Sequence, residues 1–202
     1  MVGTRQFNEA KTLDAAMRVF WEKSYAATTI DDVVAATGVK RGSLYLAYGN
    51  KEGIFKAALQ TYLNTINEAV FAPLAQGSLM EGLTHVYSAQ VAGIPEFPPG
   101  CLIAQSAAEL GARKDALGNA TRTVLQNAER PLRERLEQAI AEGEVPSDFQ
   151  IDRHVDFLAG LARSLPLTRK AAGETAARNV AQLSLEAFAG FIGEKPRPTT
   201  GK

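Results

Sequence analysis

The stretch from Thr28 to Lys51, TTIDDVVAATGVKRGSLYLAYGNK, decides the fold of this 202-residue chain. Thr29 precedes an apolar periodic segment, so its hydroxyl can accept hydrogen bonds from the free amide groups of a first helical turn. Three of the apolar side chains that follow share one face of that helix: Ile30, Val33 and Val34. Gly38 can adopt the left-handed backbone that ends a helix, and a second helix opens at Lys40. The stretch therefore predicts two short helices joined by a tight turn, the helix-turn-helix arrangement.

The second of these helices begins with cationic and hydrogen-bonding side chains, which suit contact with DNA. Lys40 or Arg41 can donate to guanine or to phosphate, and Gly42 allows a close approach of the backbone. Tyr45 points outward one turn later, where it can donate to phosphate or touch a thymine methyl group. The alternative is that the cations are ordinary solvated charges and that the tyrosines pack in the core. The predicted DNA contacts are Thr28, Thr29, Lys40, Arg41, Gly42, Ser43, Tyr45, Tyr48 and Lys51.

At these residues the chain resembles the tetracycline-repressor (TetR) family of transcription regulators. The matching segments are Thr28–Val34, Gly38-Val39, Gly42–Tyr45 with Tyr48, and Asn50–Phe55. One departure is that many relatives carry an aromatic residue and a histidine where Leu46 and Ala47 stand here. The resemblance implies a three-helix DNA-binding head, an α-helical domain for ligand binding and dimerisation, and repression that a ligand relieves. A later segment, Cys101–Leu110, resembles part of a subset of TetR-type ligand domains.

Composition and length place the chain among globular proteins, with 46% hydrophobic and 22% charged residues. The sequence shows no apolar run long enough to cross a membrane and no signal-peptide core, and its single cysteine fits a reducing interior. We therefore expect a cytoplasmic protein without membrane contact. The net charge is zero, but residues 1–62 carry eight Lys and Arg against six Asp and Glu. This small local excess means that DNA binding would depend on a few placed contacts and on dimerisation.

The rest of the chain has helical periodicity, so the predicted fold is all-α with about nine helices in total. We expect a helix-turn-helix domain over 1–50, a helical ligand-binding and dimerisation domain over 51–193, and a flexible tail over 194–202. Pro131 predicts a kink or break near residues 127–128, and Pro166 predicts a kink or an end of its helix. Outside the helix-turn-helix, the predicted helices are 7–23, 51–71, 79–91, 101–110, 115–142, 152–171 and 174–192.

The last two predicted helices are apolar on more than one side, and the end of a chain offers too little protein to cover them. A second copy of the same pair would complete a four-helix interface, which predicts a homodimer. A small, largely apolar effector of unknown identity would bind between the middle helices. The residues predicted to line its cavity are Phe71, Tyr87, Phe97, Cys101, Gln105, Leu125 and Phe157.

Two other functions are compatible with parts of the sequence. Cys101 opens a helix, where a thiolate is favoured, so a regulator switched by oxidants or electrophiles is the main alternative; a small buried side chain is the simpler interpretation. A second alternative is an interaction module that has lost DNA binding. No phosphate-binding glycine loop or nucleophile motif is present, and His85 and His154 are isolated from other metal-binding side chains. We therefore expect no enzyme, no cofactor and no metal site.

Overall fold

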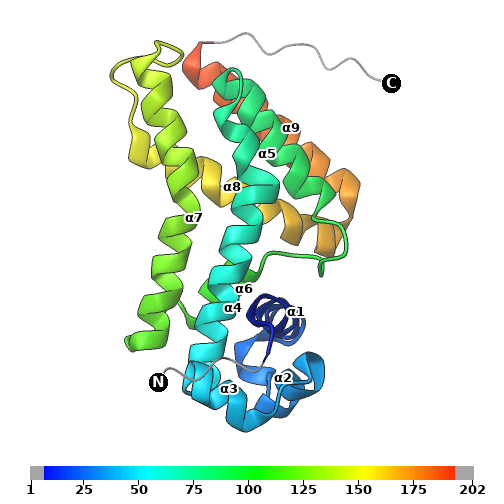
Figure 1. Cartoon of the computed structure of the whole chain (residues 1–202). Helices are drawn as coiled ribbons and strands as arrows, with labels where there is room; N and C mark the ends of the chain where they lie inside the picture. Colours follow the sequence, from blue (N-terminus) through cyan, green and yellow to red (C-terminus); the bar gives the residue numbers. More distant parts are fainter. Residues whose placement is uncertain (1–6, 194–202) are drawn as a thin grey trace. The chain divides into compact units, whose positions relative to one another are not determined.

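A computed structural model describes residues 7–193, and over that range the protein is all-α, without strands, as predicted (Figure 1). The predicted tail at 194–202 lies outside the described residues. The helices of this range are α1 (Glu9–Ala27), α2 (Ile30–Thr37), α3 (Arg41–Tyr48), α4 (Lys51–Ile66), α5 (Leu79–Ala92), α6 (Leu102–Leu110), α7 (Ala116–Ala141), α8 (Ile151–Ala172) and α9 (Glu174–Ile192). A π-helical turn, η1 (Asn67–Phe71), and a 3-10 turn, η2 (Ala72–Ala75), follow α4.

The chain forms two compact units that do not follow its order in sequence. Among the described residues, unit 1 joins 7–66 to Glu96–Ala128, whereas unit 2 joins Asn67–Pro95 to 129–193. Unit 1 thus contains α1 to α4, α6 and the first half of α7. Unit 2 contains the two η turns, α5, the second half of α7, α8 and α9. The functional division expected at residue 50 is a different one, and it stays a prediction.

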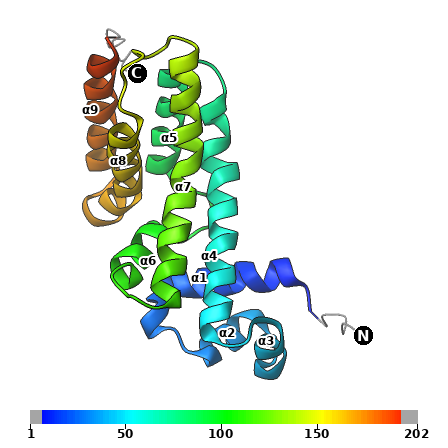
Figure 2. The same ribbon diagram turned by 90° about the vertical axis from the view of Figure 1, so that its left-hand side faces the viewer.

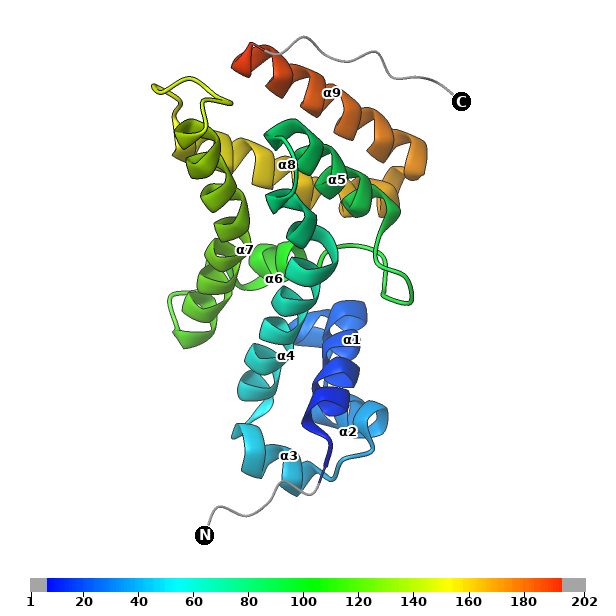
Figure 3. The same ribbon diagram turned by 45° about the horizontal axis from the view of Figure 1, so that its top comes forward.

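Unit 1 is built around α1, which packs against α2, α4 and α6 (Figure 3). The rings of Phe20 and Phe55 meet edge to face with centroids 5.1 Å apart, and those of Trp21 and Tyr62 do so at 4.7 Å. Phe20 and Trp21 are both buried, so they anchor the first helix in this core. Because edge-to-face pairs add to the free energy gained by burial, this seam fixes α1 against α4.

Unit 2 is built around α5, which contacts both α8 and α9 (Figure 2). Tyr87 of α5 is buried, and its hydroxyl donates to the carbonyl oxygen of Leu158 in α8 at 3.0 Å. The amide of Leu79 at the start of α5 donates to Glu144, which also accepts from the 3%-exposed Arg135 of α7. Burial alone would raise the pKa of Glu144, but the donors from Leu79 and Arg135 outweigh it, so the pKa is lowered. This ion pair, in which Arg135 is buried and Glu144 half-buried, therefore joins α7 to the start of α5.

The first helix continues beyond its predicted end at Lys23, because the expected connector 24–27 is itself helical except at one residue. Ser24 has φ 70°, which breaks the helical path, and the carbonyl oxygen of Ser24 accepts from both the amide and the hydroxyl of Thr28. The amides of Tyr25 and Ala26, which lie between these residues, both donate to the carboxylate of Glu109. The compact turn therefore depends on Glu109 of α6, which is distant in sequence.

Three other predicted boundaries change. The α-helical part of the fourth helix ends at Ile66, five residues early, because the chain switches there to the π turn η1. Helix α7 runs unbroken through Pro131, so a break there is wrong, whereas the alternative of a kink stays a prediction. Helix α8 likewise continues beyond Pro166 to Ala172. A proline removes only one amide donor, and a long helix can keep its remaining hydrogen bonds on both sides.

Candidate nucleic-acid interface

Helices α2 and α3 are formed by local signals that the sequence displays. The hydroxyl of Thr29 accepts from the amide of Asp32 at 3.2 Å, and the Asp32 carboxylate accepts from the amide of Thr29 at 2.7 Å. This reciprocal pair is a capping box, and it confirms the predicted cap. Gly38 ends α2 with φ 67°, the left-handed conformation that was predicted there. Each short helix buries only one side chain completely, Val33 in α2 and Leu44 in α3.

The outward face of α3 carries most of the predicted DNA contacts. Lys40, Arg41 and Gly42 are exposed at its start, and Tyr45 one turn later is 37% exposed. Ser43 is half-buried. Lys40 occupies the N-cap position, where no side chain makes a capping hydrogen bond, so the helix start leaves donors available to an anion. The face therefore joins positive charge to hydrogen-bond donors, as contact with phosphate and base edges requires.

Arg41 has a competing partner within the head. Its guanidinium group forms an ion pair with Asp31 of α2, while the two side chains stay 52% and 75% exposed. The hydrogen bond that Arg41 donates to Asp31, and then the negative charge of Asp31, raise the pKa of Arg41. An exposed pair of this kind contributes little to stability because water screens it. Arg41 can therefore exchange Asp31 for a phosphate or a guanine at small cost.

The predicted flanking contacts divide into exposed and structural residues. Thr29 is exposed, whereas Thr28 is 1% exposed and donates its hydroxyl to the Ser24 carbonyl oxygen at 2.6 Å. The structure thus gives the Thr28 side chain a role in shaping the turn before α2. Tyr48 is half-buried, with its ring 6.5 Å from that of Phe7. Its side chain therefore lies partly within unit 1, as the core-packing alternative expects.

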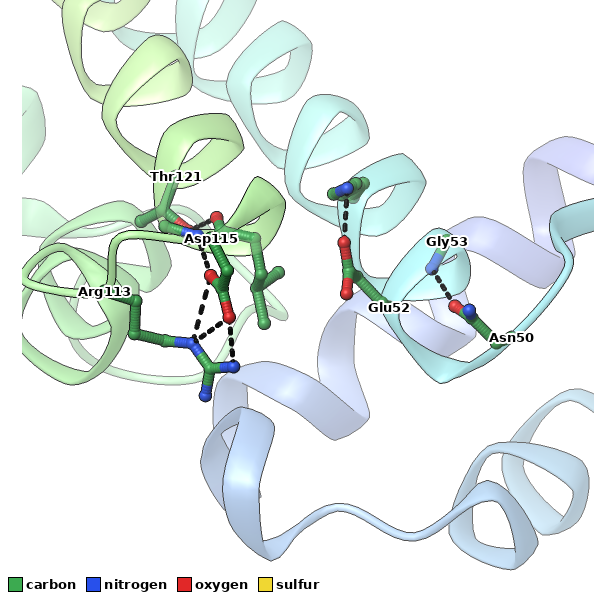
Figure 4. Close-up of polar contacts among 9 residues, drawn as sticks. Asn50, Glu52, Gly53, Arg113, Asp115 and Thr121 are labelled. Atoms are coloured by element: carbon green, nitrogen blue, oxygen red, sulfur yellow. Dashed lines mark hydrogen bonds and ion pairs between the residues drawn. The ribbon is translucent and has the colours of Figure 1, made fainter.

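Lys51 opens α4 and lies beside the end of α1. Its ammonium nitrogen is 4.5 Å from the centroid of the Tyr25 ring and 3.5 Å from the carbonyl oxygen of Ala26. The side chain of Asn50 accepts from the amide of Gly53 at 3.0 Å and so caps the start of α4 (Figure 4). The lysine is therefore positioned at a helix N-terminus, where backbone amides favour a phosphate.

The carboxylate of Glu109 on α6 binds the end of α1. Glu109 accepts from the amide of Tyr25 at 3.0 Å and from the amide of Ala26 at 2.6 Å. These two amides follow directly after the break at Ser24. Two charge-assisted bonds to one carboxylate fix both direction and distance, so the position of α6 within unit 1 is coupled to the turn that precedes α2.

The loop after α6 adds charges near the same turn. Arg113 and Asp115 form an ion pair, and Asp115 also accepts from the amide of Gly118 at 3.0 Å (Figure 4). These donors, Arg113 first, lower the pKa of Asp115. Burial, and then the charge of Glu52, raise the pKa of Tyr25. The Tyr25 hydroxyl therefore stays neutral, which makes its ring an uncharged support for Lys51.

The seven residues predicted to line an effector cavity are split between the units. Unit 1 holds four of them: Phe97, Cys101, Gln105 and Leu125. Phe71, Tyr87 and Phe157 belong to unit 2. Phe97 packs against Trp21 at 5.7 Å and under the Arg18 guanidinium at 4.3 Å. Cys101 is 2% exposed and caps α6 by accepting from the amide of Ala104, and the Tyr62 hydroxyl lies against it.

Leu46 belongs to the outward face of α3 but is absent from the predicted contacts. Its side chain is 92% exposed, more than any other large apolar side chain in residues 7–193. The sequence held a signal for this: Leu44 points inward, and two helical steps of 100° turn Leu46 to the opposite side. The predicted contacts included only polar residues and glycine, so an apolar side chain on the same face was left out.

Neither metal nor membrane chemistry is indicated within the described range. No group of three or more metal-binding side chains occurs in residues 7–193. No helix in that range is long and apolar enough to cross a bilayer.

Two family models match the chain. Residues 13–58 match the model described as bacterial regulatory proteins, tetR family, and residues 79–185 match a tetracyclin repressor-like C-terminal domain. Among known proteins, the chain is 29% identical to the HTH-type transcriptional repressor ComR of Escherichia coli K12, over 81% of this chain and 80% of that one. It is 35% identical to the uncharacterized HTH-type regulator YezE of Bacillus subtilis, over 52% of this chain and 56% of YezE.

Solved structures show the same fold. One is a cysteine variant of the TetR family transcriptional regulator CifR, complexed with 26-bp double-stranded operator DNA. It is 28% identical, has a TM-score of 0.80, and the match covers 92% of this chain and 99% of that one.

Proposed function

The chain belongs to the TetR family of transcriptional regulators, and we propose that it is a homodimeric repressor released from a pseudo-palindromic operator by a small, largely apolar effector. Family membership makes it a DNA-binding regulator and not an enzyme, as the sequence predicted. The observation that carries the proposal is the outward face of α3. Lys40, Arg41 and Tyr45 are exposed there, and Gly42 among them is exposed as well. Such a helix fits a major groove, and a two-fold dimer would present two of them about 34–36 Å apart.

The proposed DNA contacts follow the exposure of each side chain. Lys40, Arg41 and Tyr45 face bases or phosphates, with Ser43 beside them, while Gly42 brings the backbone close. Thr29 and Lys51 hold phosphates on the two flanks. Thr28 and Tyr48 have a structural role in the head instead, because Thr28 is buried and Tyr48 is partly buried against Phe7.

The proposed dimer surface is the exposed apolar side of α8 and α9. Leu183 is 67% exposed and Phe191 63%, and the ring of Phe191 meets that of Phe157 edge to face at 6.3 Å. Leu167 adds a fourth large exposed apolar side chain in this helix pair. A contiguous apolar surface on a protein indicates a protein partner, and a second copy offers an identical surface. Phe157, predicted to line the effector cavity, fits this surface better.

The proposed effector acts by favouring one arrangement of the helices. Phe97, Cys101 and Gln105 lie at or before α6, and α6 holds the turn before α2 through Glu109. Displacement of α6 would therefore alter the head. The effector can shift the equilibrium only by its preference for the arrangement that no longer fits the operator.

A selection of bound duplexes from a random pool tests the function. We expect a two-fold repeated site whose half-sites are one helical turn apart, and weaker binding by the Lys40→Ala, Tyr45→Ala variant. Candidate metabolites would then be added to the complex to find one that releases it. A monomer that retains no duplex at low ionic strength would contradict the proposal.

The thiol-switch alternative is not favoured. A 2%-exposed sulfur that caps a helix has a structural use and little access to an oxidant. Cys101→Ser should therefore keep both DNA binding and effector release. An oxidant response that the serine variant loses would instead restore the alternative.

A further inference from the structure

One apolar side chain stands alone on the polar face of α3. Leu46 is 92% exposed, whereas Leu44 on the other side of the helix is completely buried. Leu46 therefore contributes nothing to the core of unit 1. Exposing an apolar side chain to water is unfavourable, so a partner that covers it gains free energy.

Gly42, one turn before Leu46, also indicates that an external partner contacts this face of α3. Gly42 and Leu46 are four residues apart in α3, so they are neighbours on one face. Outside the nearby backbone of α3 itself and the two neighbouring residues, a Cβ atom at Gly42 would meet no atom of residues 7–193 within 4 Å, and the backbone there has no positive φ. A helical glycine lowers helix stability relative to alanine, and no contact within the described part of the chain requires this one. Close approach of an external surface explains it.

The surroundings of this pair determine the kind of surface. Lys40 and Arg41 precede it and Tyr45 lies beside it, all exposed. A protein partner would need a wider apolar patch than one leucine, and the cations favour an anionic partner. In the major groove of DNA, the feature of a base pair that suits an apolar side chain is the C5-methyl group of thymine.

We propose that Leu46 packs on a thymine methyl group in each operator half-site, with Gly42 allowing the helix to come close enough. Leu46 is thus a specificity-determining residue, and the operator carries a required 5-methylpyrimidine under α3. This inference rests on the proposed function, because it needs α3 to lie in the major groove.

Replacement of thymine by deoxyuridine, which removes only the methyl group, tests the contact. Once the operator is known, each thymine is replaced in turn and the dissociation constant is measured. We expect one position per half-site where binding weakens about fourfold, the usual effect of losing one buried methyl group. Deoxyuridine outside the half-sites is the control and should change nothing.

A double-mutant cycle, which combines a substitution in the protein with the replacement of thymine, then tests whether Leu46 is the residue that contacts the methyl group. The Leu46→Ala variant should bind the thymine operator more weakly than the wild type does. It should also bind the thymine and deoxyuridine operators equally well. The Leu46→Met variant should still prefer thymine. Gly42→Ala should weaken DNA binding while raising the midpoint of thermal unfolding, which a merely structural glycine would not do. An unchanged preference for thymine in Leu46→Ala would overturn the inference.

The two proposals fail in different ways. If the wild-type protein binds no duplex, the proposed function fails. If it binds an operator tightly but tolerates deoxyuridine at every thymine, only the role of Leu46 fails.

Discussion

Helices α3 and α9 both expose large apolar side chains, but their surroundings differ. Leu46 of α3 stands among cations and a tyrosine. Leu183 and Phe191 of α9 instead share their side of unit 2 with Phe157. The first arrangement suits a polyanion that carries isolated methyl groups, and the second suits another apolar protein surface. Exposure alone therefore does not identify a partner; the neighbouring side chains do.

The largest effect should follow from charging the apolar side of α9. Leu183→Lys with Phe191→Lys should raise the dimer dissociation constant at least about 100-fold, because each lysine would be buried without a partner. Sedimentation equilibrium measures this constant. Gln182→Lys, which adds the same charge to an exposed polar position of α9, should leave the dimer intact. A dimer that survives the double change would show that the copies meet elsewhere.

A smaller effect, confined to DNA, should follow from removing the cations of α3. Lys40→Ala with Arg41→Ala should weaken operator binding roughly 10- to 100-fold and flatten its salt dependence, since fewer counterions are released. The dimer constant should not change. Titrations of the operator at several salt concentrations measure the affinity and its salt dependence. Lys170→Ala on α8 is the control. An unchanged salt slope would place the phosphate contacts on other residues.

A gain in affinity is expected when the partner of Arg41 is neutralised. Asp31→Asn should strengthen operator binding by about fivefold, because it removes a negative charge near the phosphates and frees the guanidinium group. The gain should shrink in an Arg41→Ala background. Asp148→Asn, in an exposed segment of unit 2, is the control for charge alone. Weaker binding by Asp31→Asn would instead mean that the ion pair preorganises α3.

The smallest effect concerns pH and the capping box of α2. The ion pair with Lys23 and the Thr29 amide lower the pKa of Asp32 below its unfolded value. Its stabilisation is therefore complete above about pH 4 and declines as the pH falls toward the lower, folded pKa. Asp32→Asn should lower the midpoint of thermal unfolding by about 2–4 °C at pH 7, and the difference should narrow toward pH 3. A difference that persists in acid would show that the charge is not the cause.

Local chemistry made much of this molecule predictable. The threonine cap, the left-handed glycine and the inward leucine of the helix-turn-helix all act within a few residues, so their geometry follows from their order in the chain. The same holds for Asn50 at the start of α4 and for the extent of α9, whose predicted range matches the helix observed. Helix boundaries at prolines were less predictable, because neighbouring packing decides whether a helix survives the loss of one donor.

The sequence by itself determined the all-α class, the two short helices of the head, and the cationic start of the second one. Tertiary structure decided which of the threonines Thr28 and Thr29 is buried, how Glu109 reaches the turn before α2, and that Leu46 remains uncovered. Caps and helical faces are set by residues three or four apart, whereas burial and long-range hydrogen bonds depend on segments that meet only when the chain folds.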